Sequence, residues 1–252
     1  MNRRLYVNLF WTIASILFLI AGWQLLASVM NKPALPGPLV SFYTFAVEIS
    51  GGLWHHFVVS SYRVVISLVL SLALAVPCGM IMGREERVDR SLAPLIYIVY
   101  PVPKIVFLPV LMALLGIGDI SKITLITLVV FFQILVPIRD AARGINPAVI
   151  NSVKSLGAGR WDIYKHVVWP AVLPEVLTSL RIASGTAIAI LFFSETISSQ
   201  EGLGYYLLDA WSRAAYPEMF AGIISMSLLG FIIYIALDYL ERRACPWKYV
   251  QL

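Results

Sequence analysis

Charge is scarce in this chain. Only 13% of its 252 residues are Asp, Glu, Lys or Arg, whereas 60% are hydrophobic and the mean hydropathy is +0.83. A typical soluble domain carries about 25% charged residues. The composition therefore excludes an ordinary soluble protein and indicates an integral membrane protein with little mass outside the bilayer.

Cysteine and several catalytic motifs are also scarce or absent. The two cysteines, Cys78 and Cys245, have the spacing of neither a disulfide framework nor a zinc site, and we expect both to be small packing residues. The chain lacks the G-x-x-x-x-G-K-[S/T], G-x-S-x-G and H-E-x-x-H motifs. ATP hydrolysis through a phosphate loop and two common kinds of hydrolase site are thereby excluded.

Long apolar runs are abundant. A helix needs about 20 apolar residues to cross the hydrocarbon core, and six stretches qualify, at about 9–30, 60–83, 92–115, 120–138, 170–194 and 217–240. The period-2 alternation of a membrane barrel is absent. We expect an all-α polytopic membrane protein with six transmembrane helices in one domain, 1–252. The first helix is expected to be a retained span and not a signal peptide.

Basic residues are distributed unequally between the two sides of the membrane. With the N-terminus inside, the inner segments hold 13 of the 19 Lys and Arg residues. The outer segments hold only Lys32, Lys122 and Arg213. This bias predicts that both termini and the 139–169 loop face the cytoplasm. Attraction to anionic lipid accounts for the net charge of +5, so a nucleic-acid partner is not expected.

The loop between the fourth and fifth spans reads as two short helices joined by a glycine. Asn146 can cap a helix that begins at Pro147. Gly157 follows the last residue of the apolar face, where a left-handed residue commonly ends a helix. A second helix at 160–168 is expected to stop at Pro170. The first helix has an apolar stripe, and its own loop offers nothing to bury the stripe against.

Two interpretations of this loop stay open. An amphipathic loop can lie on the inner leaflet of the membrane, or its helices can dock into a groove on a partner protein. The glycine corner favours docking, because a passive surface helix needs no rigid corner.

The same loop resembles the signature loop of bacterial ATP-binding-cassette (ABC) importer permeases. That pattern runs Glu-Ala-Ala, three residues, Gly, nine residues, Ile, one residue and Leu-Pro. Here Gly157 and Pro170 match, and Val167 stands in place of the isoleucine. The opening triplet departs from the pattern and reads Asn151-Ser152-Val153. This chain therefore lacks the glutamate that contacts the ATPase in the family.

Four further segments resemble the nitrate/sulfonate/taurine branch of these permeases. They are residues 35–38, 51–64, 82–123 and 180–207. The resemblance extends over about residues 35–243, nearly the whole chain. The segments, taken in this order, are specific to the family but not to a substrate.

The resemblance implies a type I ABC importer permease (MetI-like) fold, with a core module at about 57–243 and coupling helices at 147–168. It implies a bacterial inner-membrane permease, paired as a homodimer or with a second permease, that works with two ATPase subunits and a periplasmic binding protein. The solute would be small and polar or anionic, such as a sulfonate, nitrate, taurine or a vitamin precursor. ATP and Mg would be bound by the partner ATPase, with no cofactor on this chain. The implied coupling residues are Asn151, Ser152, Val153, Leu156, Gly157, Arg160, Trp161, Val167 and Pro170.

Lys104 is a candidate residue of the translocation path. A charge at the centre of the bilayer costs about 2.5–3.5 kcal/mol, so ionisable groups inside spans are functional candidates. Pro101, Pro103 and Pro109 bracket this lysine, and such prolines break or kink a helix and free its carbonyls. We place the segment beside the path, where Lys104 either lowers the barrier for an anion or pairs with a carboxylate.

Arg181 and Glu195 share the fifth span. They are fourteen residues apart, which places them on nearly the same face but ~21 Å from each other. Each therefore needs a partner elsewhere, and Glu195 can pair with Arg63 or Lys104. A structural ion-pair network and a contact within a gate both remain open.

A secondary transporter or channel is the alternative class, and a membrane-embedded enzyme is the next. Secondary transporters usually show paired repeats with helices broken at corresponding places, whereas this chain has one proline-broken span and no internal repeat. A secondary carrier would also transport solute without an ATPase subunit. An enzyme would need a catalytic set within the spans, and the sequence contains no recognisable one.

Overall fold

The computed structural model describes residues 2–197 and 199–248, with side chains from Trp11 onward. Within that part of the chain every regular element is helical. Five helices there are long and apolar enough to cross a membrane. A sixth span results if a bent pair of helices is counted as one. The all-α expectation is confirmed, and the third predicted span is the bent one.

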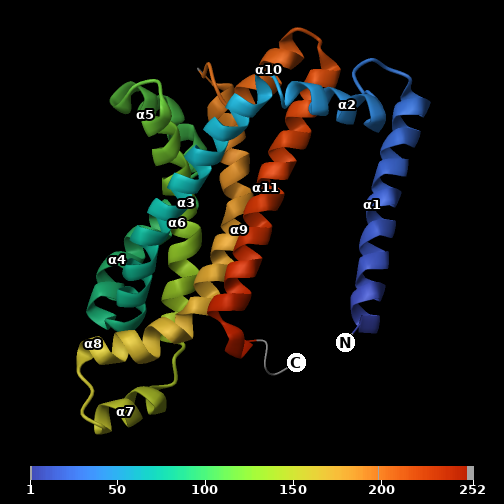
Figure 1. The fold of residues 1–252 in the computed structure, drawn as a ribbon. Coiled ribbons are helices and arrows are strands. Elements are labelled where there is room, and N and C mark those ends of the chain that lie inside the picture. The colour runs from blue at the N-terminus through green and yellow to red at the C-terminus, as the bar shows by residue number, and fades with distance from the viewer. Residues whose placement is uncertain (1, 198, 249–252) are drawn as a thin grey trace.

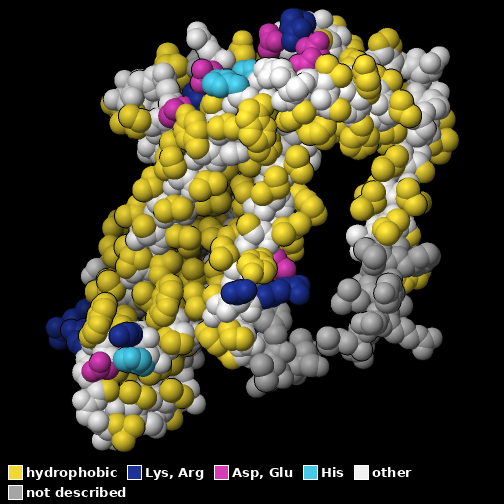
Figure 2. Space-filling view, viewed as in Figure 1, with side chains coloured by type: hydrophobic (Ala, Val, Ile, Leu, Met, Phe, Trp, Pro, Cys, Tyr) yellow, Lys and Arg dark blue, Asp and Glu magenta, His cyan; other side chains and the backbone are white. Residues whose placement is uncertain are grey.

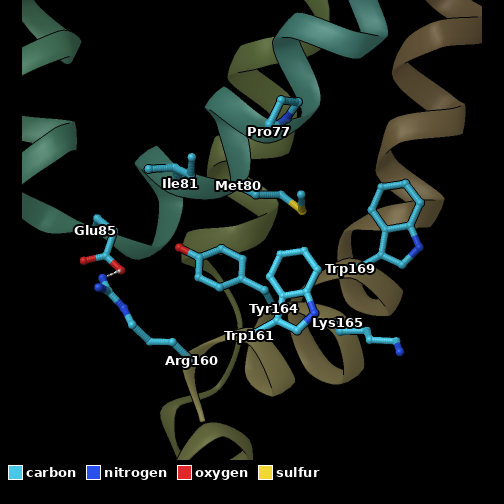
Figure 3. A pocket seen from close by; sticks show the side chains of 9 residues that line it. All are labelled: Pro77, Met80, Ile81, Glu85, Arg160, Trp161, Tyr164, Lys165 and Trp169. Carbon is cyan, nitrogen blue, oxygen red and sulfur yellow. Dashed lines mark hydrogen bonds and ion pairs between the residues drawn. The ribbon is translucent and has the colours of Figure 1, made fainter.

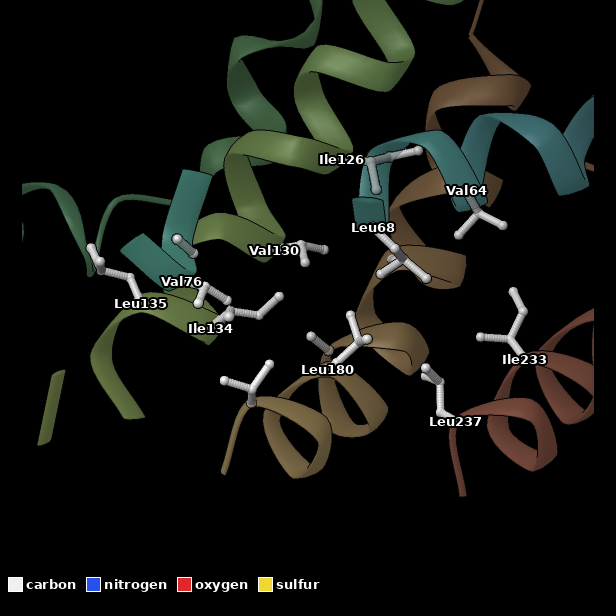
Figure 4. Packing of buried hydrophobic residues seen from close by; sticks show 14 of the residues in the cluster. Val64, Leu68, Val76, Ile126, Val130, Ile134, Leu135, Leu180, Ile233 and Leu237 are labelled. Carbon is white, nitrogen blue, oxygen red and sulfur yellow. The ribbon is translucent and has the colours of Figure 1, made fainter. Parts of the chain in front are cut away.

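Four long helices form the central bundle, and Figure 1 shows them running side by side. They are α3 (Leu53–Arg84), α6 (Asp119–Arg143), α9 (Trp169–Thr196) and α11 (Tyr216–Ala244). The apolar core between them includes Val64 and Leu68 from α3, Ile126 and Val130 from α6, Leu180 from α9, and Ile233 and Leu237 from α11 (Figure 4).

Helices α3 and α6 approach each other closely at two glycines. A Cβ added at Gly79 would lie 2.9 Å from the Ile138 side chain, and one at Gly83 would collide with the carbonyl oxygen of Arg139. Higher in the interface, the Ser71 hydroxyl donates to the carbonyl of Thr127 at 3.2 Å. Small residues and interhelical hydroxyl bonds are the usual means of helix association in lipid. They hold α3 and α6 together as a closely packed pair.

The third span is interrupted at its prolines. It consists of α4 (Glu86–Val99), a 3₁₀ turn η1 (Lys104–Phe107) and α5 (Leu108–Leu115). The two halves are bent by 83° around the segment that contains Pro101 and Pro103. The prediction that prolines break this span is confirmed.

Helix α1 (Asn2–Met30) stands apart from the bundle in Figure 1. None of the described side chains of this span is buried. Its upper end is held by Trp23, whose ring stacks on Phe220 of α11 at 5.5 Å and whose Nε1 donates to the carbonyl of Pro36 at 3.0 Å. An apolar helix without a buried face requires lipid or another protein around it.

The remaining elements lie at the two ends of the bundle. Helices α2 (Pro38–Glu48) and α10 (Leu203–Ser212) lie at one end, and α7 (Pro147–Ser155) and α8 (Arg160–Ile163) lie at the other, together with the lower ends of α1 and α11 (Figure 1). Figure 2 shows apolar side chains covering the middle of the visible face and charged side chains gathered at its ends. This distribution is that of a membrane slab flanked by water.

The expectation that both cysteines are small packing residues is confirmed for one of them and wrong for the other. Cys245 is buried, as expected of a small apolar residue, but Cys78 is exposed on α3. The exposed faces of α3 are themselves apolar, so a thiol at this position does not need the protein interior.

Candidate functional site

The loop between α6 and α9 forms an elbow, defined here as residues 147–168. The Asn146 side chain accepts a hydrogen bond from the backbone N–H of Ala148 at 2.9 Å, so the predicted cap is present. Gly157 has a φ of +84°, in the left-handed region that favours glycine. Its N–H donates to the carbonyl of Lys154 at 2.9 Å, which ends α7. The cap and the glycine corner are confirmed.

The elbow is anchored on one face and bare on the other. Ile150 is buried in the main apolar core, in the same cluster as Ile163 of α8 and Val168. The expectation that this loop offers nothing to bury the stripe against is therefore wrong, because the second helix folds back and contributes to the core. Leu156, in contrast, is 88% exposed, and Trp161 is also exposed. The elbow thus leaves two large apolar side chains exposed.

The second helix of the elbow does not stop at Pro170. One continuous helix runs from Arg160 to Thr196, and a π-helical turn, η2 (Tyr164–Val168), lies within it. Proline lacks an N–H and its ring clashes with the carbonyl four residues back in a regular helix. The wider π turn immediately before Pro170 accommodates this clash. The elbow is consequently joined to the whole of α9 without a break.

Ion pairs connect the elbow end of the bundle. Arg160 of α8 pairs with Glu85, which directly follows α3. Asp89 of α4 accepts from Arg139 of α6 at 2.8 Å and from Arg143 at 3.4 Å. These contacts connect α8 to α3 and α4 to α6 on the same side of the molecule.

The other predicted coupling residues lie on α7 and in the continuous helix. Asn151 and Ser152 are exposed, and the Ser152 hydroxyl donates to the Ala148 carbonyl one turn back. Val153, Val167 and Pro170 are half-buried. The structure therefore brings the predicted set together at one end of the bundle, with Leu156 and Trp161 as its most exposed apolar members.

A polar cluster at the opposite end joins α3, α6 and α9. Arg63 donates to Glu195 at 2.8 Å and to Asp119 at 2.8 Å. The side chains of Arg63 and Glu195 are only 4% and 0% exposed. Ser60 donates to the same carboxylate, 2.8 Å from its Oε2, and Tyr62 donates to Asp119. Of the two partners proposed for Glu195, Arg63 is the one observed.

Backbone groups at the start of α10 complete this cluster. The N–H of Gly204 donates to Glu195 at 2.9 Å, and the N–H of Leu203 donates to the Ser60 hydroxyl at 2.8 Å. Gly202 has a φ of +108°, and a Cβ there would collide with the Glu195 carboxylate. Sequence reasoning missed Ser60, Gly202 and Gly204. The two glycines in E-G-L-G were the signal that a backbone passes close to another group here.

Outside the spans, Tyr206 of α10 is linked to α2. Its hydroxyl donates to the Glu48 carboxylate at 3.4 Å. Burial raises the pKa of Tyr206, and the nearby negative charge of Glu48 raises it further. A tyrosine is protonated at neutral pH in any case, and the raised pKa keeps this hydroxyl able to donate at more alkaline pH as well.

Replacing Gly202 by alanine tests the packing of the polar cluster. Gly202 and Gly116 both have positive φ, at +108° and +86°, but of these two only Gly202 has neighbouring atoms within 4 Å of the position that a methyl group would take. We expect Gly202→Ala to lower the free energy of unfolding by about 1–3 kcal/mol more than Gly116→Ala, because only the first adds a steric clash to backbone strain. Heat-induced unfolding in detergent measures the difference, and equal losses in the two variants would contradict this account.

Arg181 has its own partners on α11. It lies 3.0 Å from Asp238 and 3.2 Å from Glu241. Glu241 also accepts from Lys248 at 2.6 Å. Arg181 and Glu195 thus belong to separate ion-pair groups, as their spacing along the helix predicts.

Lys104 lies inside the bend of the third span. Its side chain is buried, and the Nζ donates to the carbonyls of Tyr100 at 2.9 Å and Val99 at 3.1 Å. The ammonium group also lies 4.6 Å from the centre of the Phe132 ring. Lys104 thus contacts carbonyls that are freed by the break in the span. Neither of the two interpretations from the sequence, an anion-path residue or a partner for a carboxylate, included these contacts.

A hollow of about 620 Å³ opens beside the polar cluster. Its walls include Arg63 and Lys122, which are cationic, and Asp119 and Glu201, which are anionic. Within the described part of the chain, no three His, Cys, Asp or Glu side chains gather in a way that could hold a metal ion. The hollow therefore offers a ligand both positive and negative side chains.

The sequence matches a known family and several curated proteins. The family is described as binding-protein-dependent transport system inner membrane component, and the match covers residues 75–244. The taurine transport system permease protein TauC of Escherichia coli (strain K12) is 33% identical over 195 residues, covering 77% of this chain and 71% of that protein. A protein of Bacillus subtilis (strain 168), named as a candidate aliphatic sulfonates transport permease (SsuC), is 28% identical over 233 residues, covering 91% and 84%.

The fold is also that of solved importers. The methionine ABC transporter MetNI, in an inward-facing conformation, superposes with a TM-score of 0.65 at 18% identity, covering 78% of this chain and 97% of that chain. The MetI-like fold implied by the sequence resemblance is therefore confirmed. The chain is a transport subunit and not an enzyme, and it belongs to the family of binding-protein-dependent transport system inner membrane components.

Proposed function

We propose that this chain forms the translocation path of an ABC importer for a small sulfonated or similarly anionic organic solute. The substrate class is supported by the similarity to permeases named for taurine and for aliphatic sulfonates. The elbow is then the docking element for an ATPase on a separate chain, which binds the ATP and Mg.

The observation that carries the coupling role is the continuity of the elbow with α9. Leu156 and Trp161 are exposed for a partner, while the helix that begins at Arg160 continues through the membrane to Thr196. A push that reaches the second helix of the elbow is therefore passed directly into α9, while Leu156 meets the partner on the other side of the Gly157 corner. Closure of an ATPase pair on ATP would supply that push, and rocking of the spans would open the path to the other side.

The proposed assembly contains two permease chains, two ATPase subunits and a binding protein outside the membrane. Pairing of two copies is supported by α1, whose apolar side chains find no burial within one chain. The elbow end carries most of the basic residues, so we place it and both termini in the cytoplasm. Residues 1–252 act as one permease domain, with its core at about 57–243 and its coupling helices at 147–168.

For the polar cluster we propose a structural role at the outer end of the path. Arg63 and Glu195 are nearly inaccessible, and each is bonded within the chain. A buried, satisfied pair of this kind holds α3, α9 and the start of α10 in one arrangement. A role for the pair in gating would require it to separate during transport.

Reconstituted uptake tests the proposed function. Proteoliposomes containing the permease, its ATPase and its binding protein should accumulate labelled taurine or an alkanesulfonate only when ATP is supplied to the ATPase side. A carboxylate analogue serves as the control for the sulfonate group. Uptake by the purified chain alone, down an ion gradient, would contradict the proposal and favour a secondary carrier.

The orientation of the elbow has a separate test. In a background without Cys78 and Cys245, a Leu156→Cys variant should react with a membrane-impermeant maleimide only after the cytoplasmic face is opened. The exposure of Leu156 makes this position reactive in a folded protein. Labelling from the outer face of intact cells would reverse the orientation.

For Lys104 we propose a role as a positioning residue that holds the bend of the third span beside the path. We expect Lys104→Met to lower the maximal uptake rate about tenfold. The substitution removes the charged donor from the freed carbonyls, and a hydrogen bond to a charged group contributes ~1.5–3 kcal/mol. The concentration of solute that gives half-maximal uptake should stay unchanged, since the ammonium group contacts backbone carbonyls. A change confined to that concentration would instead support direct contact with an anion.

A further inference from the structure

A groove of about 740 Å³ lies beside the elbow. We call it the interfacial groove, and Figure 3 shows it from close by. One wall comes from the lower end of α3 and the other from α8, η2 and the first residues of α9. Its apolar and aromatic lining residues are Pro77, Met80, Ile81, Trp161, Tyr164 and Trp169.

The two ends of the interfacial groove differ in character. Pro77, at its upper end, lies seven residues or ~10 Å along the helix from Arg84 at the end of α3, within an apolar candidate membrane span. The lower rim contains the ion pair between Arg160 and Glu85, and Lys165. Lys165 is exposed, and its ammonium group has no ion-pair partner among the described residues. The groove is thus apolar above and cationic below.

We propose that the interfacial groove binds an anionic phospholipid of the cytoplasmic leaflet, with an acyl chain between α3 and α9 and the phosphate at Lys165. Aromatic side chains such as Trp161 and Trp169 are typical of the level where headgroups meet acyl chains. A basic residue at that level attracts anionic headgroups. The proposal rests on the orientation proposed above, because only the cytoplasmic side makes Lys165 part of the positive-inside surface.

The depth of the groove favours a lipid over a protein segment as the occupant. A soluble ATPase docked on the elbow can cover the lower rim, but Pro77 and Met80 lie within a membrane span that it does not reach. An acyl chain fills such a space from the side, and its headgroup then lies at the rim. Since one wall belongs to α3 and the other to the elbow, a bound lipid would brace the elbow against α3 next to the Arg160–Glu85 pair.

Photo-crosslinking in nanodiscs tests the proposal without requiring transport. The permease is reconstituted in phosphatidylcholine with a small fraction of phosphatidylglycerol that carries a photoactivatable acyl chain, and the labelled peptides are mapped by mass spectrometry. We expect labelling of the groove to fall about fivefold in Lys165→Glu and to persist in Lys165→Arg. Arg87→Glu is the matched control, because Arg87 is an exposed cation of α4 that does not line the groove.

A groove-filling variant tests the acyl-chain site itself. Ile81→Trp should displace the labelled chain, whereas Ile232→Trp, at a similarly exposed isoleucine on α11, should leave groove labelling unchanged. Unlabelled phosphatidylglycerol should compete and unlabelled phosphatidylcholine should not. The proposal would be overturned if labelling did not depend on headgroup charge, or if it were as strong on α11 as in the groove. It would also be overturned if cross-links to a second copy or to the ATPase blocked labelling of the groove.

Because the crosslinking experiment measures lipid binding and not transport, its result does not depend on the proposed substrate. Loss of sulfonate uptake in the reconstituted system would leave the crosslinking result standing. A failure of lipid binding would likewise leave the transport proposal intact.

Discussion

Replacing Arg63 by methionine should lower the free energy of unfolding by about 3–5 kcal/mol, the range measured when one partner of a buried ion pair is removed. The physical reason is Glu195, whose side chain is 0% exposed and would be left as a buried charge without a cation. Ser60 and the N–H of Gly204 would still donate to it, but neither carries a full charge. Thermal or denaturant unfolding in detergent, followed by the loss of monodisperse protein, measures the effect.

A double variant separates the ion pair from general disruption of the cluster. Arg63→Met combined with Glu195→Gln should recover about half of the loss or more, because no buried charge then lacks a partner. Asp119→Asn is the milder control. Its side chain is 42% exposed, so we expect a loss of no more than about 1 kcal/mol. An unaltered stability of Arg63→Met would show that Glu195 is not held as a charged partner.

Replacing Leu156 by aspartate should weaken binding of the ATPase about 30-fold, which corresponds to the ~2 kcal/mol of an interface hot spot. Leu156 is 88% exposed at the corner of the elbow, so the change should leave the fold of the permease unaffected. The physical reason is that an aspartate placed in an apolar groove loses its hydration without gaining a partner. Titration of the ATPase against the purified permease measures the affinity, and ATP-driven uptake should fall with it.

Ser155→Asp is the matched control for the elbow. It introduces the same charge one residue earlier, at an exposed polar position of α7, and should reduce ATPase affinity much less. Gly157→Pro should reduce it as strongly as Leu156→Asp, since proline cannot adopt the φ of +84° found at the corner. Full ATPase affinity in Leu156→Asp would favour the other interpretation of the loop, a helix that lies on the inner leaflet.

The two predictions address opposite ends of the bundle. The continuous helix begins at the elbow and ends at Thr196, directly after Glu195. Force that reaches Arg160 from the elbow corner is therefore carried to the polar cluster by one continuous helix. If the Arg63 and Glu195 pair separates during the cycle, variants of the pair will change the coupling of ATP hydrolysis to uptake as well as stability. If it stays closed, they will change stability alone.

Local features of the chain were predictable from the sequence. The spans follow from runs of apolar residues, because each helix satisfies its own backbone in lipid and needs no information from its neighbours. The cap at Asn146, the glycine corner at Gly157 and the break of the third span at its prolines are also local, since each depends on the backbone of a few adjacent residues. The family resemblance rests on these local patterns and their order.

Tertiary structure alone decided the contacts between distant residues. Arg63 and Glu195 are 132 positions apart, and only the packing of α3 on α9 selects Arg63 over Lys104 as the partner. The burial of Ile150 and the passage of the helix through Pro170 likewise depend on how α8 folds back onto the bundle. Hydrophobicity and backbone geometry act within a few residues and can be read along the chain. The choice of partner for a buried charge is settled by which helices pack together, and that depends on the whole fold.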